Sequence, residues 1–247
     1  YSFSVARLWN EVLLYSIRND LARPTVHARN LFHLSAAMYD AWAIVNEQGS
    51  PYLIGNNVNG FNSEFDSFSN TSDYLNEINS ISYAAYRLIL HRFNNSPSYE
   101  RILAKANSLM SLLALDINYL ESDGYQENSA DLGNYIAEQY IDYGLIDGSN
   151  EQSDYINQYY EPVNEPLAPI FSGNPTISNP NRWQPLSLDI FVDQSGNVLS
   201  ETTPEFLGAE WGSVWPFGLN EEDLTEFERD GNVYKVYHDP GSPPVID

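Results

Sequence analysis

The amino-acid sequence predicts a mainly α protein, a bundle of about five helices wrapped by a long irregular C-terminal segment with one small β-hairpin. Apolar residues recur at helical spacing through most of the first 146 residues, between turn-forming stretches. After residue 150 this period fades, and Pro, Asn and Gly become frequent. A chain of 247 residues is long enough to bury a sizeable core.

Five segments carry the helical pattern. Pro24 suits the first turn of the second helix, because its missing N–H would have no helical partner there. Thr71, Ser72 and Asp73 are candidates for the N-cap of the third helix, and Gly148 follows the fifth. The expected helices span residues 2–20, 23–45, 71–93, 96–116 and 129–145.

The other segments predict loops, turns and the hairpin. Residues 49–72 are rich in Asn, Ser and Gly and predict a surface loop, whereas LDIFVDQSGNVLSE at 188–201 predicts the hairpin. NEEDLTEFERD at 220–230 predicts the exposed face of a short acidic helix. We expect residues 1–150 to form the helical bundle and residues 151–247 to pack on it as part of one structural unit.

The composition limits the classes of function. With a formal net charge of −23, the chain lacks the basic cluster that nucleic acids require, and anionic membrane surfaces are disfavoured. No apolar run reaches the ~20 residues of a membrane-spanning helix. The absence of cysteine excludes disulfides, thiolate metal sites and a Cys nucleophile. The acidity favours an extracytoplasmic or secreted location.

Arg29, His33 and Asp40 are the titratable residues that stand out in the second expected helix. At about 100° per residue they fall on one stripe. Such a stripe is either a His–carboxylate site for a metal or a general base, or a buried ion-paired stripe that fixes helix packing. We interpret it as structural, since no HExxH spacing occurs and His27 lies about 240° around the helix from His33.

Two other groups of polar residues have simpler explanations. Arg87, His91 and Arg92 fall at the end of the third expected helix, where the helix dipole favours cations. DGSNEQSD at 147–154 offers alternating oxygen ligands but lacks the EF-hand pattern. A calcium-stabilised structural domain, using this stretch or residues 220–230, is therefore one alternative interpretation.

Trp211, Trp215 and Phe217 form an aromatic cluster in the C-terminal segment. Aromatic rings of this kind stack on sugars, and they also fill hydrophobic cores. The cluster is the candidate contact surface of a second alternative, a secreted acidic module that binds a glycan or a protein partner. Exposed tryptophans would favour that alternative, and fully buried ones would exclude it.

Four segments occur in a fixed order: RPTVHARNLFHLSAAMYDAWA at 23–43, NRWQPL at 181–186, PEFLGAEWGSVWPFGL at 204–219 and DPGSPP at 239–244. Together they resemble the N-terminal half of bacterial vanadium-dependent haloperoxidase-like proteins. Those proteins belong to the superfamily of type 2 phosphatidic acid phosphatases and class A bacterial acid phosphatases. The resemblance covers most of the chain.

The resemblance implies a site for vanadate or phosphate, built from K-x6-RP, Ser-Gly-His and S-R-x5-H segments whose cationic donors converge on the oxyanion. None of these segments is present. Arg23-Pro24 has Ser16 at the Lys position, and Lys105 and Lys235 lie outside such a motif. We therefore assign no catalytic, cofactor-binding or metal-binding residue to this chain.

We accordingly expect the N-terminal scaffold region of a haloperoxidase-like or acid-phosphatase-like protein, inactive alone. Its expected partner is the C-terminal catalytic bundle of the same polypeptide, which it would support or whose entrance it would shape. A homodimer interface is a further expected role. The full-length parent would oxidise halide with peroxide and vanadate, or hydrolyse phosphate esters. Arg29, His33 and Asp40 would then hold a scaffold helix against its neighbours.

Overall fold

The computed structural model describes residues 4–69, 73–193, 196–200, 202–229, 231–239 and 241. Their contacts divide the chain into two compact units. The first comprises Tyr1–Ile156 with Val192–Leu199, and the second comprises Asn157–Phe191 with Ser200–Asp247. Glu151 therefore belongs to the helical unit, although the sequence places the boundary at residue 150. The packing of residues 151–247 on the bundle stays a prediction.

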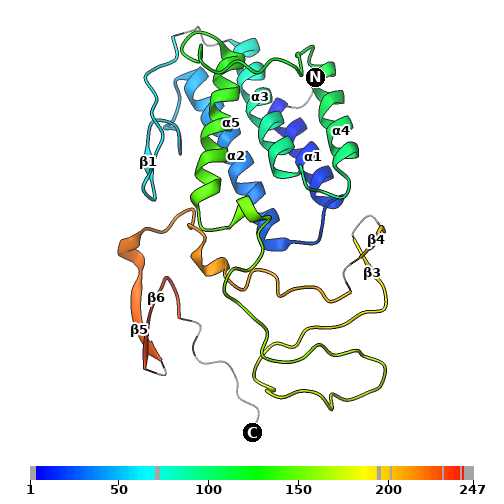
Figure 1. The fold of residues 1–247 in the computed structure, drawn as a ribbon. Helices are drawn as coiled ribbons and strands as arrows, with labels where there is room; N and C mark the ends of the chain where they lie inside the picture. The colour runs from blue at the N-terminus through cyan, green and yellow to red at the C-terminus, as the bar shows by residue number, and fades with distance from the viewer. Residues whose placement is uncertain are drawn as a thin grey trace. The chain divides into compact units, whose positions relative to one another are not determined.

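The described part of the first unit contains five α-helices, so the predicted mainly α class is confirmed. Consecutive helices alternate in direction, and α3 contacts each of the other four (Figure 1). No helix in the described part of the chain is both long and apolar enough to cross a membrane. The helices are α1 (Val5–Arg18), α2 (Pro24–Asn46), α3 (Tyr74–Arg92), α4 (Tyr99–Leu112) and α5 (Ser129–Ile146).

Two of these helices begin at residues that favour a helix N-terminus. Pro24 is the first residue of α2, as predicted. Asp73 is the N-cap of α3, and its carboxylate accepts a hydrogen bond of 2.7 Å from the backbone N–H of Asn76. Thr71 and Ser72, the other two cap candidates, lie outside the described residues.

The core of the helical unit lies around α3. Trp9 of α1 is fully buried, and its indole Nε1 donates to Ser82 Oγ at 3.0 Å. Gly133 allows α5 to approach α3 closely, because a Cβ atom there would lie 2.6 Å from the carbonyl oxygen of Ser80. Burial of each large apolar side chain in such a core contributes about 1.5–3 kcal/mol. The close approach of α3 and α5 also brings the ends of these helices together.

Three two-stranded antiparallel sheets occur in the described residues, where the sequence predicts one hairpin. The predicted hairpin is present as β3 and β4, and a second lies within the predicted surface loop. The prediction of a short acidic helix at 220–230 is wrong. Glu221–Asp223 form a single 3-10 turn, and the strand β5 follows it. The strands are β1 (Asn57–Val58), β2 (Phe61–Asn62), β3 (Phe191–Val192), β4 (Val198–Leu199), β5 (Thr225–Arg229) and β6 (Asn232–Val236).

The second unit has little regular structure, and Asn164 organises part of it. This side chain is 2% exposed. Its Nδ2 donates to the carbonyl oxygens of Asn179, Arg182 and Trp183, at 2.9, 2.9 and 3.2 Å. Its Oδ1 accepts from the backbone N–H groups of Ser178 and Asn179, at 3.1 and 2.8 Å. One amide therefore replaces the hydrogen bonds that a helix or sheet would supply to this backbone.

Glu210 has the same role nearby in the second unit. Its carboxylate accepts hydrogen bonds from the backbone N–H groups of Gln158, Tyr159 and Tyr160, at 2.9, 2.6 and 2.7 Å. These bonds stabilise the ionised form and lower the pKa of Glu210. Glu210 thus fixes a turn of irregular backbone.

Candidate functional site

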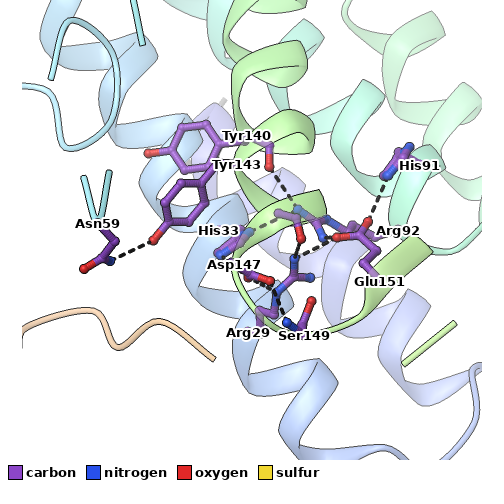
Figure 2. A network of polar contacts seen from close by, with 11 residues as sticks. Arg29, His33, Asn59, His91, Arg92, Tyr140, Tyr143, Asp147, Ser149 and Glu151 are labelled. Carbon is purple, nitrogen blue, oxygen red and sulfur yellow. Dashed lines mark hydrogen bonds and ion pairs between the residues drawn. The ribbon is translucent and has the colours of Figure 1, made fainter. Parts of the chain in front are cut away.

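A buried group of charged side chains lies where α2 begins and α3 and α5 end. Arg29 of α2 donates through Nε to Asp147 and through Nη2 to Glu151 at 2.7 Å. Arg92, the last residue of α3, donates through Nη1 to the same Glu151 oxygen. We call these four residues the Arg–carboxylate network (Figure 2). All four side chains are at most 7% exposed.

The chain around the end of α5 makes room for both guanidinium groups. Gly144 has no side chain there, and a Cβ atom would lie 2.6 Å from Arg29 Nη2 and even closer to Arg92. The carbonyl oxygen of Gly144 accepts from Arg29 Nη2 at 2.9 Å. Gly148 and Asn150 have positive φ values of 86° and 57°, which turn the chain tightly after the helix. The two carboxylates, four residues apart, can therefore both reach Arg29, and Glu151 also reaches Arg92.

His33 lies inside this site in its neutral form. Its Nδ1 is 3.0 Å from Nη2 of Arg92, and because a guanidinium only donates, Nδ1 must accept. The proton of the neutral ring is then on Nε2, which faces Asp147 at 3.8 Å. Burial, together with the charges of Arg29 and Arg92, lowers the pKa of His33 well below its ordinary value. His33 is thus a hydrogen-bonding spacer between charged groups.

His91 connects the site to solvent. Its Nε2 lies 2.9 Å from Glu151 Oε1, and the side chain is 30% exposed. Burial and the charges of Arg92 and Arg29 lower the pKa of His91 to about 4. Burial and Arg29 also lower the pKa of Arg92, to about 9, so that it remains charged at neutral pH. With both histidines neutral, the two arginines and two carboxylates balance in charge.

Asp40 lies apart from the network, so the structure divides the predicted stripe. Asp40 is fully buried and accepts hydrogen bonds from the backbone N–H groups of Tyr52, Leu53 and Ile54, at 2.6, 3.0 and 3.2 Å. The hydroxyl of Tyr140 also donates to it, at 3.0 Å. Burial raises the pKa of Asp40, although these four bonds oppose the shift. Asp40 therefore anchors the loop after α2, while Arg29 and His33 contact α3 and α5.

Sequence reasoning missed Arg92, Asp147 and Glu151 as partners of Arg29 and His33. The helix-dipole explanation of the cations at the end of α3 overlooks these contacts, because Arg92 pairs with Glu151 and Arg87 donates to Asn134 Oδ1 at 3.2 Å. The signal available in the sequence is the acidic run at 147–154, which contains both Asp147 and Glu151.

The carboxylates of that run face cations of the protein. Asp147 and Glu151 belong to the Arg–carboxylate network, and Asp154 pairs with Arg23 at 3.0 Å. Across the described residues, no group of three or more His, Asp or Glu side chains is placed to hold a metal ion. Calcium binding at 147–154 would therefore compete with existing ion pairs.

The candidate aromatic surface lies in the second unit. Phe217 is 65% exposed, whereas Trp211 and Trp215 are partly buried. Trp211 begins a short 3-10 turn that ends at Ser213. The tryptophans are therefore neither fully buried nor fully exposed, and the glycan-binding interpretation stays open.

The geometry describes a closed, charge-balanced group of side chains, in which each guanidinium group donates to a carboxylate. Comparison with protein-family models and with curated proteins finds no match for this chain.

Proposed function

We propose that this chain is a non-catalytic scaffold, the N-terminal region of a vanadium-dependent haloperoxidase-like or acid-phosphatase-like protein. One observation carries the proposal: Arg29 and Arg92 are neutralised inside the chain by Asp147 and Glu151. An oxyanion site needs cationic donors that lack such partners. The four segments that resemble the family support the choice of parent protein.

The two lysines of the chain make other contacts in the residues that the structure describes. Lys105 Nζ lies 5.8 Å from the ring centroid of Tyr15, and Lys235 pairs at 3.7 Å with Glu226 on an exposed strand. Lys105 and Lys235 belong to different units of the chain.

The proposed role is mechanical. The Arg–carboxylate network ties the ends of α3 and α5 to the start of α2, and a rigid helical unit can support a catalytic bundle of the same polypeptide or shape its entrance. A homodimer interface is a further proposed use of the same unit. Vanadate, or phosphate as substrate, would bind to the parent protein outside this chain. We further propose an extracytoplasmic location, which the acidity supports.

A vanadate titration followed by ⁵¹V NMR tests the proposal. Arg29 Nη1 and Arg92 Nε are buried and have no hydrogen-bond partner among the described residues, so an oxyanion that entered the network would bind at these donors. We expect no broadening of the vanadate signal by the purified chain, and no bromide oxidation with peroxide or hydrolysis of p-nitrophenyl phosphate. Turnover that disappears in Arg92→Met would contradict the scaffold role.

The parent protein is tested separately, by immunoblot of the source with an antibody against this 28.0 kDa chain. We expect a band of much higher mass, whose peptides include Ser-Gly-His and K-x6-RP segments. A single band at the mass of the chain would rule out the proposed parent.

The exposure of Phe217 favours a second candidate function, binding of a glycan or protein partner by the aromatic surface of Trp211, Trp215 and Phe217. Quenching of tryptophan fluorescence by a polysaccharide, lost in Trp215→Ala, is the result expected from glycan binding. An unchanged spectrum across a panel of polysaccharides would remove the glycan from this candidate function.

A further inference from the structure

A pocket of about 360 Å³ opens between α1, α2 and α3, near the beginning of α1 and α3. This volume lies within the range of small-molecule sites, which is about 300–1,000 Å³. Its lining combines apolar, aromatic and polar side chains from the three helices. They include Asn10, Met38, Tyr39, Trp42, Glu77 and Ile81.

Two aromatic rings form one wall of this pocket. The ring centroids of Tyr39 and Trp42 are 5.9 Å apart, with an angle of 35° between the ring planes. Gly49 contributes to the position of Tyr39, because a Cβ atom there would lie 2.5 Å from the Tyr39 hydroxyl. Aromatic faces attract cations through the ring quadrupole, most strongly in the case of Trp.

Glu77 supplies a negative charge to the same pocket. It lies in the first turn of α3, and its Oε2 accepts a hydrogen bond of 3.3 Å from Asn46 Nδ2. No Lys, Arg or His forms an ion pair with Glu77 among the residues that the structure describes. The net charge of −23 adds a long-range attraction for cations.

We propose that this pocket binds a small organic cation with a quaternary or tertiary ammonium group. The ammonium would lie against Trp42 and Tyr39, and Glu77 would neutralise its charge. A primary ammonium carries three strong donors and is firmly hydrated, so a largely apolar pocket with one carboxylate suits it less well. Asn10 is available for a hydroxyl or carbonyl group of the ligand.

Isothermal titration calorimetry with choline tests the proposal on the full chain. We expect a dissociation constant below about 10 mM, a reasonable value for so small a ligand. The uncharged isostere 3,3-dimethylbutan-1-ol has the same shape, and we expect it to bind at least about tenfold more weakly, because it gains no cation–π attraction. Equal binding of the two compounds, or no choline binding at 50 mM, would overturn the proposal.

Variants locate the site. Trp42→Leu should weaken choline binding about tenfold, and Trp42→Phe, which keeps a ring, should weaken it less. Glu77→Gln keeps the hydrogen bond to Asn46 but removes the charge, and it should weaken binding about fivefold. Glu100→Gln is the matched control, since Glu100 is an exposed carboxylate in the first turn of α4. Choline affinity unchanged in Trp42→Leu and Glu77→Gln, with normal thermal unfolding, would place binding elsewhere and refute the assignment.

Discussion

The two units of the chain keep their polar groups paired in different ways. In the helical unit, the buried charged side chains of the Arg–carboxylate network pair with one another, as Arg29 and Arg92 do with Asp147 and Glu151. In the second unit, a buried side chain pairs with backbone, as Asn164 does with three carbonyl oxygens and two N–H groups.

The difference follows from how the backbone N–H and C=O groups of each unit find hydrogen-bond partners. A helix pairs its own N–H and C=O groups, so charged side chains buried between helices pair with other side chains, whereas the backbone partners of Asp40 lie in the loop after α2. Irregular chain leaves backbone groups without regular partners, and side chains must supply them. The stability of the helical unit should therefore depend on its buried charged side chains, and the stability of the second unit on side-chain amides such as that of Asn164.

The largest expected effect comes from Glu151→Gln. The substitution leaves two buried guanidinium groups facing one carboxylate, Asp147, and should cost about 3–5 kcal/mol in free energy of unfolding. Urea denaturation measures the loss. Glu100→Gln, on the exposed face of α4, should change stability by less than about 0.5 kcal/mol. Equal effects of the two substitutions would show that the buried charge pairing contributes little.

Asn164→Ala should destabilise the second unit by about 3 kcal/mol, because it leaves several backbone groups without partners. Hydrogen exchange should accelerate at the amides of Ser178 and Asn179. Asn157→Ala is the matched control, since within the described residues its side-chain amide makes one hydrogen bond, to the carbonyl oxygen of Phe206 at 3.0 Å. We expect about 1 kcal/mol for the control. Unchanged exchange at Ser178 in Asn164→Ala would contradict the organising role.

Gly144→Ala tests the space that the two arginines require. The added methyl group would overlap the guanidinium groups of Arg29 and Arg92, and such overpacking costs about 1–3 kcal/mol. Thermal unfolding measures the change. The exposed Gly212, whose Cβ position is open, serves as the control and should tolerate Ala. Full stability of Gly144→Ala would mean that the network adjusts freely.

An effect similar in size to that of Gly144→Ala depends on pH. The folded-state pKa of His91, about 4, lies below its value of about 6.5 in an unfolded chain, so the unfolded state binds more protons between these pH values. The contribution of His91 to the free energy of unfolding is complete above about pH 6.5 and is lost as pH falls toward 4. After allowance for the partial exposure of His91, we expect wild type to lose about 2 kcal/mol more than His91→Gln between pH 7 and pH 4.5. The free energy of unfolding of both proteins is measured by urea denaturation from pH 7 to pH 4.5. Equal losses in wild type and His91→Gln would contradict this expectation.

Apolar periodicity predicts the five helices, because each helix records its buried face in its own residues. It cannot reveal the network, since Arg29 and Asp147 are 118 positions apart in the chain. The contacts of Asp40 are also hidden from the sequence, because three of its partners are backbone N–H groups, which no residue type marks. The hairpin of β5 and β6 was available in the sequence: TEFER and NVYKV flank Asp-Gly, a favoured turn pair, but the acidic residues suggested a helix.

A double-mutant cycle between Arg92 and Glu151 tests the central claim, that these side chains act together as a structural clamp. The unfolding free energies of wild type, Arg92→Met, Glu151→Gln and the double variant are compared in urea. We predict that the double variant loses at least about 2 kcal/mol less than the sum of the single losses, because each single change leaves a buried charge without its partner. Losses that add to within about 0.5 kcal/mol would contradict the clamp.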